Sequence, residues 1–204
     1  MTPADDALRA SLRGRRFEAV VIGGSAGGVD ALVALLPALP AGFALSVFCI
    51  LHVPGNRDSR LAELFDERLP MPVKEAADKE EIAPGTVYFA GAGYHLSVER
   101  DRTFSLSCEP PVHFARPAID VLMESSADVY GPALAGILLT GANHDGADGM
   151  ARIRARGGFT VVQDPADAHV PTMPVSAIHR CAPNLILPLA RIHALLPMLE
   201  TNEP

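Results

Sequence analysis

Continuous apolar runs alternate with amphipathic segments along most of this chain. The apolar runs cover residues 17–23, 43–51, 134–140 and 159–163. Such runs are typical of strands that are buried on both faces of a parallel sheet. Helical spacing of apolar residues separates or follows them, at residues 28–37, 58–68, 117–129 and 146–156. The alternation predicts an α/β fold with a doubly wound, mostly parallel sheet and helices on both faces.

A middle region departs from this pattern. Residues 87–90, 94–98 and 103–107 alternate in polarity and are joined by short turns. They predict a small antiparallel hairpin or meander attached to the parallel core. Residues 189–199 predict a closing helix, whose end is limited by Pro197.

The length of the chain indicates the number of domains, and its net charge indicates which partners are unsuitable. The 204 residues suit one domain over 17–204, preceded by a flexible lead-in over 1–16. The net charge of −7 argues against nucleic acid or an anionic membrane as the main partner. The longest apolar stretch, residues 43–53, is too short to cross a bilayer, and the first sixteen residues lack the features of a signal peptide. Three cysteines without metal-like spacing indicate free thiols, so we expect a cytoplasmic protein.

The first predicted strand runs directly into a Gly-x-Ser-x-Gly motif at Gly23, Ser25 and Gly27. A strand, a sharp turn and a helix are the context in which this motif exposes a nucleophilic hydroxyl. The backbone N–H of Ala26 would then be free to bind an oxyanion.

Two other interpretations of this turn have to be compared with the nucleophile interpretation. A glycine-rich turn with a buried or capping serine would have no catalytic role. A dinucleotide-binding turn would need a glycine in place of Ser25 and an acidic residue about 20 positions later, but the next predicted strand ends at His52. The nucleotide interpretation therefore fails twice.

Two more polar residues follow predicted strands. His52 closes the second apolar run, and Asp145 lies just past the third. The carboxyl ends of parallel strands meet at one edge of a sheet, so Ser25, His52 and Asp145 are expected to lie together there. A serine is activated by a neighbouring imidazole, which a carboxylate orients, and these residues are therefore candidates for a hydrolytic triad.

Alternatives to each assignment stay open at this point. His52 could be a packed structural histidine, and Asp145 could cap the following helix. The candidate site also has rivals, which are Asp164 for the carboxylate and four other histidines for the base, His95, His113, His144 and His169. A metal site of His144, Asp145 and His169 lacks any familiar ligand spacing.

Several ordered motifs resemble the chemotaxis protein-glutamate methylesterases, in their CheB-type catalytic domain, from about residue 18 to 190. The matching segments are Val-Ile-Gly-Gly-Ser-Ala-Gly-Gly, Leu-His-Val-Pro, Pro84–Phe89 with Tyr94–Val98, Arg116–Leu122, Thr140-Gly141 through Asp145–Met150, and Met173-Pro174 before Ala177-Ile178.

The resemblance implies hydrolysis of glutamate γ-methyl esters on chemoreceptor helices, and in some members deamidation of receptor glutamines. It places the catalytic residues at Ser25, His52 and Asp145 and makes 17–204 a methylesterase-like catalytic domain. It implies no cofactor and no metal, and its partner is the cytoplasmic helices of methyl-accepting chemoreceptors. It also implies neither nucleic-acid binding nor direct membrane insertion.

The chain departs from the family pattern at three points. Ala26 stands where members commonly carry threonine, and Ala142 stands where they carry a bulkier residue. Sixteen residues before the first strand are too few for the receiver domain that members usually bear, so we expect no control by phosphorylation in cis. Two other functions are weighed beside methylesterase activity, an esterase or amidase for another substrate and a receptor-binding module with decayed catalysis.

Overall fold

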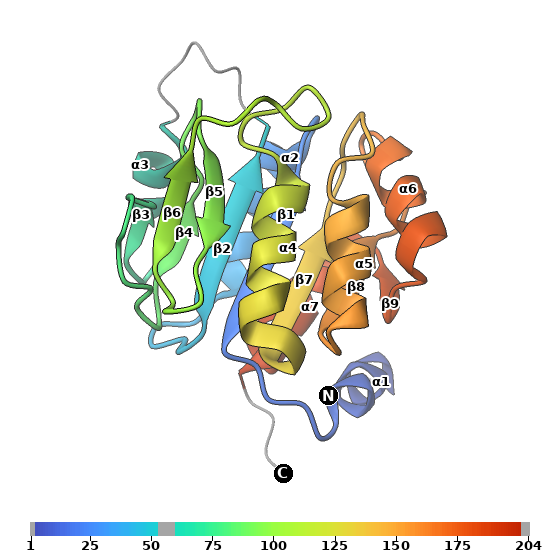
Figure 1. The fold of residues 1–204 in the computed structure, drawn as a ribbon. Helices are drawn as coiled ribbons and strands as arrows, with labels where there is room; N and C mark the ends of the chain where they lie inside the picture. Colours follow the sequence, from blue (N-terminus) through green and yellow to red (C-terminus); the bar gives the residue numbers. More distant parts are fainter. Residues whose placement is uncertain (1–2, 53–59, 201–204) are drawn as a thin grey trace.

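A sheet of seven parallel strands forms the centre of the molecule (Figure 1). The structure is a computed structural model, and it describes residues 3–52 and 60–200. The strand order is β3-β4-β2-β1-β7-β8-β9, so β1 lies in the middle. The strands are β1 (Ala19–Gly24), β2 (Ser46–Leu51), β3 (Val73–Glu75), β4 (Val87–Phe89), β7 (Leu134–Leu138), β8 (Phe159–Gln163) and β9 (Leu185–Leu187). The predicted doubly wound α/β fold is confirmed.

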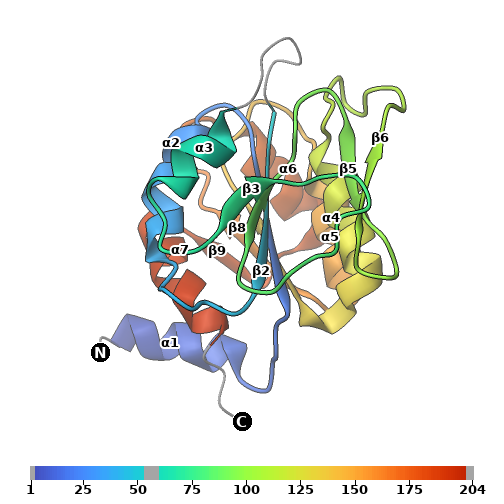
Figure 2. The same cartoon turned by 90° about the vertical axis from the view of Figure 1, so that its left-hand side faces the viewer.

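Helices cover both faces of this sheet because the side chains of each central strand alternate between the faces. Val20 and Ile22 of β1 pack into the core on one side, and Ala19 and Val21 pack into the core on the other. The first core is covered by α1 (Pro3–Leu12), α2 (Gly28–Leu35), α3 (Leu61–Asp66) and α7 (Leu189–Leu195). The second is covered by α4 (Ile119–Tyr130), α5 (Ala147–Ala155) and α6 (Thr172–Cys181). Figure 2 shows the two layers from the side.

The small antiparallel unit has two strands rather than three. β5 (His95–Val98) pairs antiparallel with β6 (Phe104–Ser107), which confirms the predicted hairpin. The meander that would have included residues 87–90 is wrong, because β4 pairs parallel with both β2 and β3. All three residues of β4 are buried, as expected for a strand inside a parallel sheet.

The amino-terminal segment differs from the expected lead-in. Residues 3–12 form α1, in which Leu8 and Leu12 are four positions apart and share one face. Both side chains are buried in the first core, so this segment is packed against the domain and is not a loose extension. Figure 1 shows α1 at the edge of the sheet opposite the carboxyl ends of the strands.

Other boundaries differ modestly from the expected ones. The helix predicted over 58–68 is observed as α3, Leu61–Asp66. Residues 58 and 59 of the predicted helix lie outside the described part of the chain. The last two residues of the Leu-His-Val-Pro motif, Val53 and Pro54, also lie outside it. The closing helix over 189–199 follows β9 and is divided into α7 and the 3-10 segment Leu196–Leu199. In the described part of the chain, two further 3-10 segments, Leu36–Ala38 and Gly131–Ala133, join other elements. Among the described residues, no helix is long and apolar enough to cross a membrane.

Candidate active site

Ser25 lies in a tight turn between β1 and α2. Its N–H donates to the carbonyl oxygen of Thr140 at 2.9 Å, and its own carbonyl oxygen accepts the N–H of Gly28 at 2.7 Å. The hydroxyl of Thr140 contacts the Ala26 carbonyl oxygen at 2.9 Å and accepts the N–H of Val170 at 2.8 Å. Thr140 therefore joins the serine turn to the end of β7 and to the loop after β8.

Two glycines of the motif are required by close contacts. Gly27 has a φ of 79°, and a Cβ there would lie 2.8 Å from the Cβ of His169. A Cβ on Gly23 would lie 2.6 Å from Cγ2 of Ile119 at the start of α4. Their small size lets the His169 loop and α4 approach the serine turn.

His52 and Asp145 are brought together as predicted. His52 Nε2 lies 2.7 Å from Asp145 Oδ2, although 93 positions separate the residues in sequence. The His52 side chain is mostly buried, at 14% exposed, and that of Asp145 is fully buried. The N–H of His52 donates to the Gly24 carbonyl oxygen at 3.3 Å, which fixes the His52 backbone beside the residue preceding Ser25.

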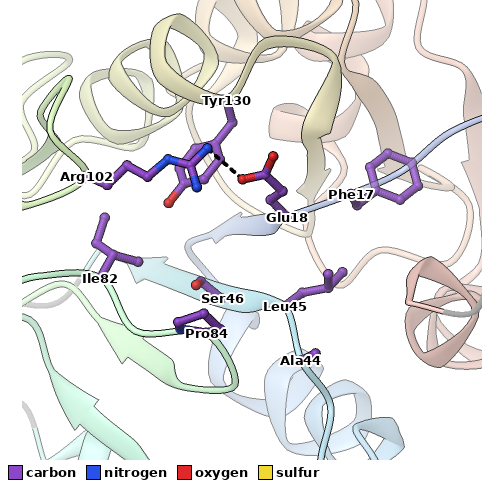
Figure 3. A pocket seen from close by; sticks show the side chains of 9 residues that line it. All are labelled: Phe17, Glu18, Ala44, Leu45, Ser46, Ile82, Pro84, Arg102 and Tyr130. Atoms are coloured by element: carbon purple, nitrogen blue, oxygen red, sulfur yellow. Dashed lines mark ion pairs between the residues drawn. The ribbon is translucent and has the colours of Figure 1, made fainter.

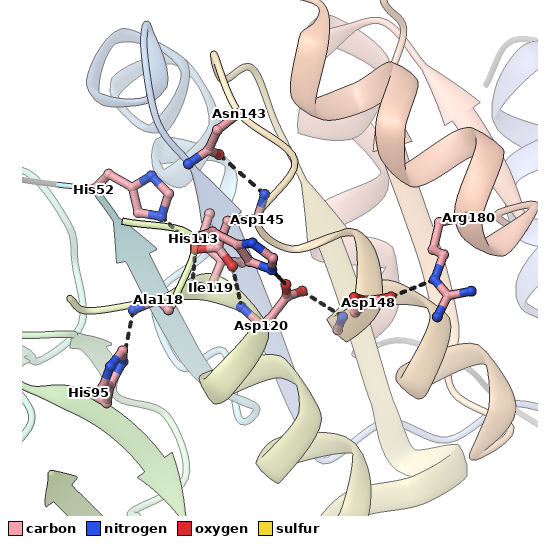
Figure 4. A network of polar contacts seen from close by, with 11 residues as sticks. His52, His95, His113, Ala118, Ile119, Asp120, Asn143, Asp145, Asp148 and Arg180 are labelled. Carbon is pink, nitrogen blue, oxygen red and sulfur yellow. Dashed lines mark hydrogen bonds and ion pairs between the residues drawn. The ribbon is translucent and has the colours of Figure 1, made fainter. Parts of the chain in front are cut away.

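Asp145 caps α4 and not the helix that follows it in sequence. Its Oδ2 accepts the N–H of Ile119 at 2.7 Å, and its Oδ1 accepts the N–H of Asp120 at 2.9 Å (Figure 4). The residue that precedes α4 is Ala118, which has no side-chain oxygen, and Asp145 supplies the missing acceptor from another segment.

These contacts set the charge of Asp145. Burial alone would raise the pKa of this carboxyl, but the hydrogen bonds from His52 and from the N–H groups of Asp120 and Ile119 outweigh it. The pKa of Asp145 is therefore held below its ordinary value, and the carboxylate is ionised at neutral pH. An ionised carboxylate at this distance accepts the His52 Nε2–H and so fixes the orientation and tautomer of the imidazole.

The Ser25 side chain is half-buried at the same edge of the sheet. Within the described part of the chain no hydrogen bond of its hydroxyl is found, so contact with His52 requires a side-chain movement. Catalytic hydrogen bonds are often long before substrate binds. The N–H of Ala26 also donates to no described backbone group, and α2 starts only at Gly28, so this N–H lies in the turn before the helix.

A second histidine–carboxylate pair lies near the first: His113, a rival for the base in the sequence, is paired with Asp120, which was not a candidate. His113 Nε2 is 3.2 Å from Asp120 Oδ2, and the N–H of Gly149 donates to Asp120 Oδ1 at 2.7 Å. Burial raises the pKa of Asp120 to about 7, the nearby Asp145 carboxylate adds to this rise, and Gly149 and His113 oppose it. The sequence pointed to Asp120 only through its place in the Arg116–Leu122 motif.

The rival residues have other contacts. Asp164 Oδ1 accepts the N–H of Ala166 at 2.9 Å and so closes its own loop. His95 accepts the N–H of Ala118 at 3.2 Å through Nδ1, and its Nε2 lies 3.1 Å from the Pro110 carbonyl oxygen. His95 is thus a buried link between β5 and the segment that leads into α4.

The metal alternative is not supported by the geometry. In the described part of the chain, the set of potential ligands that converges within 4.8 Å is His113, Asp120 and Asp148, and not the set of His144, Asp145 and His169. Asp148 Oδ1 is already paired with Arg180 Nε at 2.5 Å. The guanidinium supplies the positive charge that a metal ion would bring to this carboxylate.

A separate hollow of about 270 Å³ lies at the opposite edge of the sheet, where β1 and β2 begin (Figure 3). Its polar groups are paired: Glu18 binds Arg102 at 2.6 Å, and the Arg102 guanidinium lies 5.2 Å from the centre of the Tyr130 ring. The hydroxyl of Ser46 contacts the Ala83 carbonyl oxygen at 3.2 Å. No nucleophile and base are placed together by these contacts, so the candidate site is the edge that carries Ser25.

Comparison with known proteins agrees with the fold and with the sequence motifs. The family model described as CheB methylesterase matches residues 20–196. A crystal structure of the CheB methylesterase catalytic domain of Thermotoga maritima superimposes with a TM-score of 0.84 and 31% identity, covering 90% of this chain and 98% of that one.

Curated relatives are similar over most of the chain. A putative protein-glutamate methylesterase/protein-glutamine glutaminase of Leptospira interrogans is 42% identical over 186 residues, which are 91% of this chain and 96% of the relative. A protein-glutamate methylesterase/protein-glutamine glutaminase of Anaeromyxobacter dehalogenans is also 42% identical, over 91% of this chain but 54% of its own length. The chain therefore spans about half the length of some relatives and nearly all of others.

Proposed function

This chain belongs to the CheB methylesterase family, and on that premise we propose that it hydrolyses glutamate γ-methyl esters on chemoreceptor proteins through Ser25, His52 and Asp145. The observation that carries the proposal is the 2.7 Å contact between His52 and Asp145 at the sheet edge where Ser25 follows β1. It supplies the oriented base that a serine nucleophile needs.

The first half of the reaction forms an acyl-enzyme. His52 Nε2–H donates to Asp145, so His52 Nδ1 is the nitrogen left to accept the Ser25 proton. Ser25 Oγ attacks the ester carbonyl carbon, and the carbonyl oxygen becomes an oxyanion that the Ala26 N–H stabilises. When the intermediate collapses, the bond between the carbonyl carbon and the methoxy oxygen breaks, and His52 returns the proton to methoxide, which leaves as methanol.

The second half restores the enzyme. His52 takes a proton from water, whose oxygen attacks the acyl carbon, and the bond to Ser25 Oγ then breaks. The proton passes from His52 to the Ser25 oxygen, and the product carboxylic acid loses the second proton of the water to solvent and leaves as the glutamate carboxylate. Asp145 stays ionised throughout and stabilises the imidazolium in each half. A glutamine amide would follow the same course with ammonia as the leaving group, as the names of the relatives suggest.

The buried surroundings of Asp145 support this division of roles. Its three oxygen contacts, to His52 and to the N–H groups of Ile119 and Asp120, hold the carboxylate in one orientation. Its own N–H donates to the side-chain oxygen of Asn143 at 3.2 Å, which fixes the backbone as well. The substrate helices of chemoreceptors are cytoplasmic, so the proposal also places the protein in the cytoplasm.

Methanol release from a methylated chemoreceptor fragment tests the proposal. Ser25→Ala is expected to lower kcat to background, a loss on the order of 10⁶-fold in other serine hydrolases. Ser11→Ala is the matched control, because Ser11 lies on α1 and its hydroxyl contacts only the Leu8 carbonyl oxygen. Unchanged methanol release by the Ser25→Ala protein would contradict the proposal.

A further inference from the structure

The segment between β6 and α4 carries an unusual turn beside the candidate site. Val112 and Ala115 exchange two backbone hydrogen bonds, of 3.1 and 2.9 Å, and so close a two-residue turn. The two residues at its tip, His113 and Phe114, have φ values of 50° and 64°. Two successive positive φ values favour glycine or asparagine, and two large side chains there carry a conformational cost.

The base of this turn is anchored on both sides. Arg116 Nη1 donates to the carbonyl oxygens of Cys108 and Glu109, at 2.9 and 3.1 Å. The imidazole of His95 contacts Pro110 before the turn and Ala118 after it. The strained backbone is therefore held by its surroundings, which is how such conformations persist at functional sites.

The two tip side chains point in opposite directions. His113 turns toward the protein, where it meets Asp120 and packs its ring at 4.3 Å from that of His144, the residue before Asp145. Figure 4 shows His113 close to Asp145. Phe114, in contrast, is 104% exposed, whereas the other seven phenylalanines are buried. The turn thus exposes one aromatic ring to solvent at the residue after His113, whose own ring contacts that of the residue before Asp145.

We propose that Phe114 is a docking residue that packs against an apolar face of the substrate helix that carries the esterified glutamate. This inference rests on the proposed methylesterase function. The net charge of −7 gives the chain no overall charge attraction toward a helix that carries acidic glutamates, so apolar contact through Phe114 is the complementarity that this turn offers. On an amphipathic helix, apolar residues three or four positions from the ester lie one turn away, within reach of a ring beside the active site.

Two substrates with the same ester separate docking from chemistry. One is a methylated helical chemoreceptor fragment, and the other is a short unstructured peptide with a single glutamate γ-methyl ester. Methanol release is measured for wild type, Phe114→Ala, Phe114→Leu and the control Ile186→Ala. Ile186 is also an exposed apolar residue, at 44%, but it lies on the edge strand β9.

For each variant, kcat/KM for the receptor fragment is divided by kcat/KM for the short peptide. We expect this ratio to fall about tenfold in Phe114→Ala, because KM for the receptor fragment increases. Phe114→Leu should recover most of the ratio, and Ile186→Ala should keep the wild-type value. An unchanged ratio, or an equal loss on both substrates, would overturn the docking role while leaving the methylesterase function in place. A wild-type protein that releases no methanol from either substrate would overturn both.

A second copy of this chain is the other possible occupant of the Phe114 surface. Sedimentation of wild type and Phe114→Ala distinguishes it. A monomer in both cases supports the substrate helix. A wild-type dimer that Phe114→Ala dissociates would overturn the proposal in favour of self-association.

Discussion

Asp145 Oδ2 accepts the backbone N–H of Ile119 at 2.7 Å, which makes the proposed catalytic carboxylate the cap of a helix that begins 26 positions before it in sequence. The same oxygen lies 2.7 Å from His52 Nε2. The Asp145 carboxylate therefore holds both the start of α4 and the imidazole of His52. The orientation of His52 depends on the position of α4, and the start of α4 depends on Asp145.

Replacing Asp145 should consequently damage both activity and stability. Asp145→Asn keeps the side-chain shape but removes the charge, and we expect kcat to fall by about 10⁴-fold, as in other triads that lose this carboxylate. Loss of a charged cap should lower the free energy of unfolding by about 1 kcal/mol. Methanol release and denaturant unfolding measure the two effects.

Asp164→Asn is the control for this change, because within the described residues the Asp164 side chain accepts only the N–H of Ala166 in its own loop. Its backbone N–H, which donates to the Leu187 carbonyl oxygen, is kept in the variant. It should retain nearly full activity. If Asp164→Asn were the damaging change and Asp145→Asn were not, the carboxylate assignment would be wrong.

Asp120 predicts a pH dependence of stability. Its pKa is about 3.8 in the unfolded chain and about 7 in the folded protein, because burial and the Asp145 carboxylate favour the protonated form. Between these values the folded state holds a proton that the unfolded state has lost, so this group's contribution to stability decreases as pH rises from about 4 to about 7. The groups that face it are the Gly149 N–H, His113 and the carboxylates of Asp145 and Asp148.

Asp120→Asn should remove this slope. The free energy of unfolding of the variant minus that of wild type is expected to increase, on the order of 2 kcal/mol, between about pH 4.5 and pH 7.5. Denaturant titrations at several pH values measure this difference. The contributions of most other titrating groups cancel in it, because these groups are the same in the variant and in the wild type. A difference that stays constant with pH would contradict the raised pKa.

Gly27 and Gly14 form a matched pair for testing the serine turn. Both have positive φ values, 79° and 71°, but a Cβ on Gly14 would meet no atom within 4 Å, whereas one on Gly27 would meet His169. Gly14→Ala should cost about 1 kcal/mol of stability and leave methanol release intact. Gly27→Ala should cost more and also lower kcat, because the turn that carries Ser25 and Ala26 has to shift. Equal effects of the two changes would show that the His169 contact is unimportant.

His95 should stabilise the folded state through its two backbone partners. His95→Leu leaves the Ala118 N–H and the Pro110 carbonyl oxygen without their partner, which should lower the free energy of unfolding by about 1–3 kcal/mol. His193→Leu, at an exposed position on α7, is the control and should change stability by less than about 0.5 kcal/mol. Thermal or denaturant unfolding checks both, and a His95→Leu protein as stable as wild type would contradict the structural role.

The central strands were predictable because a strand buried on both faces leaves a continuous apolar run. β1, β2, β7 and β8 all lie within such runs. The short strands β3 and β9 were missed, since each has only three residues and is partly exposed at the sheet edge. α6 was missed as well, because Pro174 argues against a helix although proline is tolerated in a first turn.

The placement of His52 beside Asp145 was predictable from the sequence, but the wider contacts of these residues were not. His52 and Asp145 each follow a strand, and parallel topology then brings them to one edge. The cap that Asp145 gives to α4, the pair of His113 and Asp120, and the inward-facing His95 depend on which segments pack together. Sequence periodicity describes single elements and carries no information on such contacts between distant segments.

Covalent labelling of Ser25 tests most directly the claim that the His52–Asp145 pair activates this hydroxyl. A serine-reactive phosphonate is incubated with wild type, His52→Ala and Asp145→Asn, and intact and peptide masses are measured. The account predicts one phosphonate per wild-type chain, located on Ser25, and strongly reduced labelling in both variants. Absence of labelling in wild type, or equal labelling of Ser25 without His52, would contradict it.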